Sequence, residues 1–274
     1  MTPVIMGVVN ATPDSFSDGG RFLDPDAALR QADALLAAGA TIIDVGGEST
    51  RPGAERVGAD EEMRRALPVV TALARRGVRV SIDTMNAATA RAAVHAGAAI
   101  VNDVSGGLAD PQLLGEVAAS SAQVVLGHWR GPSSDMYARA DYADPVQEVA
   151  DELAARIAAA DVAGIPRDRV IVDPGIGFGK TPAQSWAVLA GLERLVAAGA
   201  RVLVGTSRKR FLQTALDTHT DAAGATADEA RRDLATAVTS VLAAQAGAWG
   251  VRVHNAGATR DALAVLAHWQ GRTS

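Results

Sequence analysis

The chain has 274 residues, and its 26 Lys and Arg against 31 Asp and Glu give a formal net charge of −5 at pH 7. An acidic chain with a pI near 5.5 lacks the basic surface of a general nucleic-acid binder, so we expect no nucleic-acid partner. The absence of cysteine excludes disulfides, thiolate nucleophiles and cysteine-ligated metals. The chain shows no signal-peptide pattern and no apolar run of the roughly 20 residues that a membrane span requires. We therefore expect a cytoplasmic protein without a membrane partner.

Short runs rich in Val and Ile, each bounded by Gly, Asp or Asn, recur along the chain. Such near-continuous apolar content is typical of strands that are buried on both faces, as in a parallel sheet. The predicted strands are Val4–Asn10, Thr41–Gly47, Arg79–Thr84, Ile100–Val104, Gln123–His128, Val170–Asp173, Arg201–Ser207 and Val251–Asn255.

Segments rich in Ala, Leu and Arg, with apolar residues at helical spacing, separate these strands. Several begin with Asp-Pro, which predicts an N-cap and a proline in the first turn. Most end at a glycine, which predicts a left-handed residue after the helix. The predicted helices are Asp24–Ala38, Ala59–Arg76, Ala87–Ala96, Asp110–Ala119, Asp144–Ala163, Pro182–Ala198, Thr226–Ala246 and Ala258–Trp269.

The strict alternation of strand and helix, repeated eight times, predicts a (β/α)8 barrel, because each crossover is long enough to join parallel strands. An open, doubly wound sheet is the alternative, but it needs no eighth strand. No linker, low-complexity stretch or charge run divides the chain. We therefore expect an α/β fold in which residues 1–274 form a single TIM-barrel domain.

Polar residues stand at the predicted carboxyl ends of the strands, where barrel enzymes build their active sites. Some of them, such as Asp103 and Ser105, can equally serve as helix caps. Alternate residues of a strand face the same way, so Arg252 and His254 share a face, whereas Asn102 and Asp103 point in opposite directions.

The strand-end side chains form two groups with different chemistry. Carboxylates and an amide, which can pair with the N–H donors of a planar ligand, are supplied by Asp83, Asn102 and Asp173. Cationic side chains suited to phosphate are supplied by Arg51, Arg252 and His254. Arg208 and Lys209 could serve either group.

Seven motifs, running in order from the first predicted strand to the last, resemble the dihydropteroate synthase family. They are Asn10–Gly20, Asp44–Gly53, Ser81–Thr84, Asn102–Gly107, Asp173–Gly179, Ser207–Phe211 and Arg252–His254. The resemblance implies a TIM-barrel enzyme of folate biosynthesis. Such an enzyme joins 6-hydroxymethyl-7,8-dihydropterin pyrophosphate to p-aminobenzoate, giving 7,8-dihydropteroate and pyrophosphate. The resemblance also implies Mg²⁺ as cofactor, competition by sulfonamides, and a homodimer, for which Thr226–Ala246 is our candidate face.

The resemblance further implies roles for the residues at matching positions. Catalytic roles are implied for Asp83, Asp173 and Lys209, which hold the pterin together with Asn102. Contacts with the pyrophosphate are implied for Asn10, Thr50, Arg51, Arg252 and His254, with Asn10 on the side of the Mg²⁺. The walls of the p-aminobenzoate site are implied to include Phe16, Thr50, Pro52 and Phe178.

Three positions depart from the family pattern. Gly127 stands where a methionine commonly precedes a histidine, and we expect this to weaken the packing on the pterin. Asn255 stands where an aspartate is frequent, and Arg210 replaces a common serine. Asn255 can still cap a helix, so we expect activity to be retained. We expect the loops Ala11–Phe22 and Ser49–Gly58 to be mobile without ligand and to close over the site.

Two other functions share parts of this pattern. A methyltransferase that uses methyltetrahydrofolate and a corrinoid protein would need the carboxylates, but neither Arg51 nor Arg252. A non-catalytic paralogue is supported mainly by Gly127. We favour the synthase. Because no base is evident on the side of the amine nucleophile, we expect a dissociative reaction.

Overall fold

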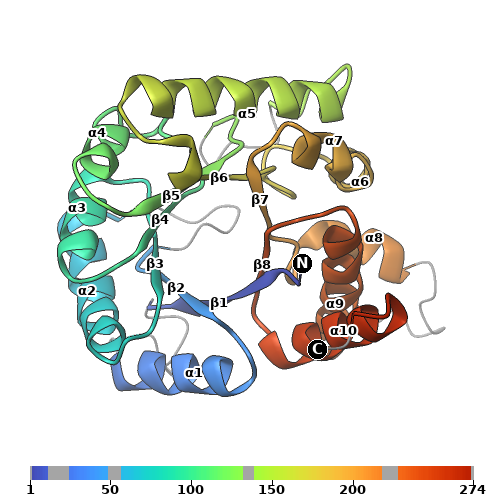
Figure 1. Ribbon diagram of the computed structural model, residues 1–274, viewed down its shortest axis with the longest axis horizontal. Coiled ribbons are helices and arrows are strands. Elements are labelled where there is room, and N and C mark those ends of the chain that lie inside the picture. Colours follow the sequence, from blue (N-terminus) through green and yellow to red (C-terminus); the bar gives the residue numbers. More distant parts are fainter. Residues whose placement is uncertain (1, 12–24, 49–56, 132–138, 218–227, 273–274) are drawn as a thin grey trace.

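The computed structural model describes residues 2–11, 25–48, 57–131, 139–217 and 228–272. Its strands are parallel and pair in chain order, and β1 also pairs with β8, so the sheet closes into a barrel (Figure 1). The strands are β1 (Val4–Asn10), β2 (Ile42–Gly46), β3 (Val80–Asp83), β4 (Ile100–Asp103), β5 (Gln123–Gly127), β6 (Val170–Asp173), β7 (Arg201–Val204) and β8 (Gly250–Val253). The predicted (β/α)8 fold is confirmed.

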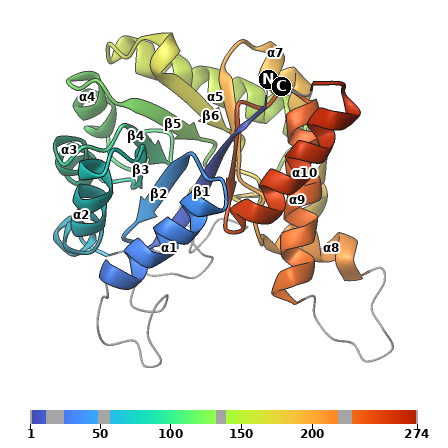
Figure 2. The same ribbon diagram turned by 60° about the horizontal axis from the view of Figure 1, so that its bottom comes forward.

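Helices surround the barrel, as Figures 1 and 2 show. They are α1 (Pro25–Ala37), α2 (Ala59–Arg75), α3 (Ala87–His95), α4 (Leu113–Ala118), α5 (Pro145–Val162), η2 (Arg167–Arg169), α6 (Pro182–Ala190), α7 (Leu192–Ala197), η3 (Arg210–Leu212), α8 (Gln213–Leu216), α9 (Glu229–Gln245) and α10 (Ala256–Trp269). No helix in the described ranges has the length and apolar content to cross a membrane. The cytoplasmic location stays a prediction.

On both sides of β7 the helical layer differs from the sequence prediction. The predicted helix Pro182–Ala198 is split at Gly191 into α6 and α7. A Cβ at Gly191 would lie 2.5 Å from Cγ1 of Val146 on α5, so the close approach of α5 requires glycine at this point. The short helices η3 and α8 directly follow Lys209. The sequence did not predict them, because helices of one turn carry too little periodicity to detect.

Several predicted helix ends are confirmed. Glycines that follow helices have positive φ values, for example 91° at Gly164, a conformation that residues with a Cβ rarely adopt. The Asp144 side chain caps α5 by accepting hydrogen bonds from two backbone N–H groups. Thr181 and Gln184 form a capping box at the start of α6.

The apolar core has two layers. The outer layer fills the space between the strands and the helices. The inner layer closes the barrel lumen with completely buried side chains, which are Met6, Ile42, Ile100, Val125, Ile171 and Leu203. Because alternate residues share a face, the residues two positions further along these strands also point into the lumen, nearer its carboxyl end. On β2, β4 and β6 these residues are Asp44, Asn102 and Asp173, so the fold places polar side chains above an apolar floor.

Candidate active site

The ring above the apolar floor contains several of the residues that the sequence singled out. Its polar members come from the ends of six strands and are Asn10, Asp44, Asp83, Asn102, Asp173 and Arg252. By contrast, Asp103 binds the hydroxyl and backbone N–H of Ser105 and the N–H of Gly107. Asp103 therefore has a structural role, as the alternative to a site role predicted, but it fixes the loop after β4 and does not cap a helix, because α4 begins only at Leu113.

Arg252 links two acidic members of the ring. Its Nε donates to Oδ2 of Asp44 at 2.6 Å, and its Nη2 donates to Oδ2 of Asp83 at 2.7 Å. Asn102 Nδ2 donates to the same oxygen of Asp44 at 3.0 Å. Arg252 therefore lies among the carboxylates, although the sequence grouped it with the phosphate-binding cations. Its contact with a pyrophosphate stays a prediction.

Asp44 is the ring member that the sequence prediction left without a role. Its side chain is completely buried, and Oδ1 has no hydrogen-bond partner among the residues that the structure describes. A signal was present, because Asp44 lies two positions after the buried Ile42 of the same strand and shares its face. Asp44 therefore positions the guanidinium of Arg252 from below the mouth of the barrel.

The pKa values in this group reflect both burial and pairing. Burial by itself lowers the pKa of Arg252, but the neighbouring Asp44 and Asp83 outweigh it and raise that pKa above its ordinary value. Burial raises the pKa of Asp83, and Arg252 acts in the opposite direction. Buried charges are tolerated when good ion-pair geometry offsets their desolvation, which the Arg252 contacts provide.

Asp173 and Lys209 meet beside Gly205. A Cβ placed on Gly205 would lie 3.6 Å from Oδ2 of Asp173 and 3.8 Å from Nζ of Lys209. Asp173 Oδ1 accepts the N–H of Gly175 at 2.7 Å, and Lys209 Nζ donates to the carbonyl of Ile176 at 2.5 Å. The glycine at position 205 leaves the space beside both charges free of its own side chain.

The environment of Lys209 suits an anion or a hydrogen-bond acceptor. Burial lowers the pKa of Lys209 to about 8, and attraction to Asp173 opposes this shift. Burial likewise raises the pKa of Asp173, and Lys209 opposes it. The Lys209 ammonium also lies 4.3 Å from the centre of the Phe178 ring. Lys209 is thus charged at neutral pH and loses its proton as the pH rises through about 8.

Asn10 contributes an amide oxygen to the ring. A Cβ on Gly46 of the neighbouring strand would lie 3.7 Å from Oδ1 of Asn10 and 3.7 Å from Oδ2 of Asp83. Oδ1 of Asn10 and Oδ2 of Asp83 therefore both lie beside Gly46. Within the described ranges, no group of three or more His, Cys, Asp or Glu side chains could hold a metal ion. A metal ion at Asn10 would need further ligands from a bound substrate.

The segment that carries Lys209 is fastened to β8 and α9. Ser207 Oγ accepts the backbone N–H of His254 at 3.0 Å and lies 2.9 Å from Nδ1 of the same residue. Arg208 has a φ of 56°, and its guanidinium donates to both carboxylate oxygens of Asp233 at 2.7 and 2.9 Å. Arg208 therefore faces α9 and Lys209 faces the ring, which resolves the choice that the sequence left open.

Asn255 has a specific partner at the same place. Its Oδ1 caps α10 by accepting the N–H of Ala258 at 3.0 Å, which confirms the expected cap. Its Nδ2 donates to Oδ2 of Asp233 at 3.0 Å. Burial by itself raises the pKa of Asp233, but the hydrogen bonds from Arg208 and Asn255 outweigh it and lower that pKa. The side-chain amide of Asn255 thus supplies a hydrogen-bond donor to the carboxylate of Asp233, which an aspartate at position 255 would not.

The structure also gives a local explanation for Gly127. A Cβ at this position would lie 2.4 Å from the backbone carbonyl oxygen of Val104. The space beside Gly127 is therefore occupied by the loop after β4, and a larger residue would require that loop to shift. The effect of Gly127 on pterin binding stays a prediction.

Several predicted site residues lie outside the described residues, and their roles stay predictions. They are Phe16, Thr50, Arg51 and Pro52, together with most of the loops Ala11–Phe22 and Ser49–Gly58. Arg210 lies within the described ranges, at the start of η3, and is exposed.

Comparison with known proteins agrees with this geometry. A family model described as pterin binding enzyme matches residues 6–254. The chain is 50% identical to the dihydropteroate synthase of Mycobacterium leprae over 271 residues, which cover 98% of this chain and 94% of the relative. It is 43% identical to the dihydropteroate synthase of Streptococcus pyogenes, with 96% and 94% of the two chains covered.

Solved structures give the same result. The Xanthomonas albilineans dihydropteroate synthase with 4-aminobenzoic acid has a TM-score of 0.88 and 42% identity, covering 98% of this chain and 93% of that one. A structure from the same organism in complex with 7,8-dihydropteroate has a TM-score of 0.85 and 39% identity, covering 98% and 94%.

The chain therefore belongs to the pterin-binding enzymes, a class that fits both its barrel and the polar ring at the barrel mouth. Within that class it belongs to the dihydropteroate synthases, which are transferases of folate biosynthesis. Its function is the condensation of 6-hydroxymethyl-7,8-dihydropterin pyrophosphate with p-aminobenzoate, which gives 7,8-dihydropteroate and pyrophosphate.

We predict that Asn255→Asp weakens the site although it preserves the cap of α10. Aspartate caps helices as well as asparagine does. Its carboxylate, however, would replace a donor that stands 3.0 Å from Asp233, leaving two carboxylates in contact. We expect a loss of roughly 1–3 kcal/mol in the free energy of unfolding, measured by urea denaturation, and a lower kcat/KM.

Asn255→Ser is the matched control, because serine keeps the cap and adds no charge. We expect it to fall between the wild type and Asn255→Asp in both measurements. If Asn255→Asp were as stable and as active as the wild type, the contact with Asp233 would have no role in the site.

Proposed function

We propose that the ring at the barrel mouth is the site of this condensation and that the reaction is dissociative. One observation carries the proposal: two carboxylate–cation pairs, Asp83 with Arg252 and Asp173 with Lys209, converge at the carboxyl end of the barrel. The pterin edge presents N–H donors that suit carboxylates, and the pyrophosphate suits cations. In this proposal Asn102 holds the pterin with these residues.

In the first step, the C–O bond between the pterin methylene group and the pyrophosphate breaks, and the electron pair leaves with the pyrophosphate. The pterin ring delocalises the resulting cation, and the carboxylates of Asp83 and Asp173 stabilise its charge. Arg252 and His254 hold the leaving group. A guanidinium has five N–H donors, and the contacts of Arg252 with Asp44 and Asp83 use two. Arg252 can therefore bind an anion without leaving the ring.

In the second step, the neutral amine of p-aminobenzoate attacks the methylene carbon. The C–N bond forms, and the nitrogen then releases one proton to solvent. Because the electrophile is already a cation, the amine needs no strong base. The ring of Phe178, which lies beside Lys209, supports a place for the aryl group. The remaining walls in this proposal are Phe16, Thr50 and Pro52, and Arg51 contacts the pyrophosphate.

We further propose Mg²⁺ as the cofactor, with Asn10 as its protein ligand. Mg²⁺ prefers oxygen ligands and commonly binds through one or two protein groups together with substrate phosphates. The amide oxygen of Asn10, close to the carboxylate of Asp83, fits this requirement. When bound, the ion supplies positive charge that stabilises the departing pyrophosphate.

A homodimer through α9 is also part of the proposal. Leu234, Val238 and Leu242 are spaced four residues apart on this helix and therefore lie on one face. They are 66, 52 and 54% exposed. We call these three residues the apolar stripe of α9. Contiguous exposed apolar surface marks association sites in soluble proteins, and a second copy of the chain would cover the stripe.

The proposed site predicts turnover that depends on both substrates, on Mg²⁺ and on Asp173. We expect pyrophosphate release only when both substrates are present, loss of turnover in excess EDTA, and recovery on adding Mg²⁺. Asp173→Asn keeps the shape of the side chain and removes its charge. We expect it to lower kcat/KM by about 100-fold or more, the typical effect of removing a group that stabilises charge in the transition state.

Asp161→Asn is the control for this assay, because Asp161 is exposed at the carboxyl end of α5, which leads to the start of β6 and therefore lies at the opposite end of the barrel from the ring. We expect it to retain wild-type activity. An active Asp173→Asn variant would contradict the assigned role of Asp173, and an inactive wild type would contradict the proposed function itself.

The dissociative route predicts an α-secondary deuterium isotope effect clearly above unity on the pterin methylene group. The reacting carbon becomes trigonal before the amine bonds to it, so its C–H bending modes loosen in the transition state. Competition between labelled and unlabelled pterin pyrophosphate measures the effect on kcat/KM. A value near unity would indicate that the amine attacks while the C–O bond is still intact.

The homodimer predicts that a charge in the middle of the apolar stripe separates the subunits. We expect the wild type to be a dimer by size-exclusion chromatography with light scattering, and Val238→Glu to be a folded monomer. Val162→Glu, at an exposed apolar position on α5, should remain dimeric. A monomeric wild type, or a dimeric Val238→Glu variant, would contradict this interface.

A further inference from the structure

Lys180 is the largest fully buried side chain in the described part of the chain, with 1% of its surface exposed. It immediately precedes Thr181, the N-cap of α6. Its Nζ lies 2.9 Å from Nδ1 of His128 and donates to the carbonyls of Gly175 and Phe178, both at 3.1 Å. An ammonium group has three N–H donors, and these three acceptors use all of them.

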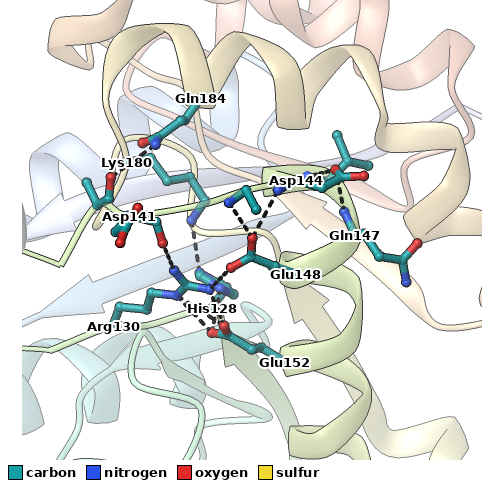
Figure 3. Close-up of polar contacts among 12 residues, drawn as sticks. His128, Arg130, Asp141, Asp144, Gln147, Glu148, Glu152, Lys180 and Gln184 are labelled. Carbon is teal, nitrogen blue, oxygen red and sulfur yellow. Dashed lines mark hydrogen bonds and ion pairs between the residues drawn. The ribbon is translucent and has the colours of Figure 1, made fainter.

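His128 connects this ammonium to α5. With Lys180 as an ammonium, Nδ1 of His128 accepts its hydrogen bond and the ring proton is on Nε2. Nε2 lies 2.9 Å from Oε2 of Glu152 (Figure 3), in a contact whose geometry is not that of a hydrogen bond. Burial lowers the pKa of His128 to about 4, so the ring is neutral at physiological pH. The backbone N–H of His128 also donates to the carbonyl of Asp173 at 2.9 Å. Lys180 and the backbone contact therefore orient the ring, with Glu152 beside Nε2.

Arg130 fixes the outer end of this group. Its Nε donates to Oε1 of Glu152 at 3.0 Å, and its Nη2 donates to Oε2 of Glu148 at 2.6 Å. Its guanidinium lies 3.7 Å from the centre of the Tyr142 ring. Figure 3 shows these side chains as one connected group between α5 and the buried amine. The contacts thus lead from two carboxylates of α5 to the ammonium of Lys180.

These contacts help to fix the conformation of the segment 174–179. Its three glycines have positive φ values, and its Ile176 side chain is completely buried in the core. Two lysines also hold its backbone, because Lys180 binds two of its carbonyls and Lys209 binds that of Ile176 at 2.5 Å. The same segment carries Phe178, whose ring lies beside the Lys209 ammonium. The position of this backbone therefore decides where Phe178 stands in the active site.

The burial of Lys180 is unfavourable for stability by itself. Burial lowers its pKa to about 7, and no carboxylate in the described ranges forms an ion pair with it. An apolar side chain of similar length would avoid this desolvation, but it would remove the Lys180 donor from the carbonyls of Gly175 and Phe178, and the Gly175 carbonyl would keep only the backbone N–H of Phe178. Lys180 thus stabilises the backbone conformation of this segment, whereas its burial by itself lowers the free energy of unfolding of the protein.

We propose that Lys180, oriented by His128 and Glu152, is a positioning residue of the active site. Its ammonium fixes the segment 174–179 and thereby sets the place of Phe178 on the p-aminobenzoate side. This inference rests on the proposed function for the role of Phe178. Lys180 itself touches no substrate, so its effect reaches the reaction only through the backbone that it holds.

Lys180→Met is the direct test, because methionine keeps the length of the side chain and has no donors. We expect KM for p-aminobenzoate to rise about tenfold, since a 1 Å misplacement of a positioning group can cost on the order of 100-fold in rate. The dissociation constant of the pterin pyrophosphate should change less, because Asp83 and Asn102 belong to β3 and β4, whereas only Asp173 and Lys209 of the proposed pterin residues bind this segment.

Glu152→Gln and Glu148→Gln form a matched pair on α5. Both carboxylates bind Arg130, but only Glu152 contacts His128. We expect Glu152→Gln to raise KM for p-aminobenzoate in the same direction as Lys180→Met, and Glu148→Gln to leave it unchanged. This pair carries the test if Lys180→Met does not fold.

Amide hydrogen–deuterium exchange supplies a readout that needs no turnover. We expect faster exchange in the segment 174–179 of Lys180→Met and Glu152→Gln, and unchanged exchange in β1–β4. If wild-type protein is inactive but exchange in this segment responds as expected, the proposed function fails and the backbone role of Lys180 stands. Unchanged exchange and KM in folded Lys180→Met, or equal effects of the two glutamate variants, would overturn the inference.

Discussion

The two-residue period of a strand, imposed on a closed barrel, is the constraint on which the rest of the structure depends. Once the parallel strands close, every second side chain must enter the lumen. The apolar floor excludes water from the lower lumen, and the polar side chains one layer higher must then satisfy one another. Arg252 and Asp44 are 208 residues apart, yet they bind because both follow this period. The active site is therefore a consequence of strand register rather than of any single loop.

The lumen contains buried carboxyl groups that can stabilise a positively charged intermediate. Three carboxylates, those of Asp44, Asp83 and Asp173, face the two cations Arg252 and Lys209. Burial opposes the ionised form of Asp83 and Asp173, and pairing with the cations opposes that effect. The carboxyl groups of Asp83 and Asp173 thus lie where the proposed pterin-methyl cation would form, and that positive charge would favour their ionised form. A preorganised negative environment of this kind stabilises developing positive charge without reorganisation.

The strands, the fold and most of the ring could be predicted from the sequence, because apolar runs and strand-end polar residues are local patterns. Asp44 carried the same signal, but its role depends on partners that only the closed barrel brings together. The break at Gly191 depends on its contact with α5, and helical spacing alone does not reveal it. Lys180 and His128 are 52 positions apart, and nothing in either local sequence indicates that they share a hydrogen bond. Contacts set by packing between distant elements are thus the part that sequence patterns omit.

The helix α9 links the proposed dimer face to the candidate active site. Its outer face carries the apolar stripe, and its inner face supplies Asp233 and Thr236, which bind the guanidinium and the backbone N–H of Arg208. A left-handed conformation at a residue with a Cβ is unfavourable by roughly 1–3 kcal/mol and persists only where the surroundings enforce it. Lys209 follows directly, so α9 fixes the backbone from which a site lysine extends. A homodimer formed through α9 would therefore stabilise the active site of each copy without adding a residue to it.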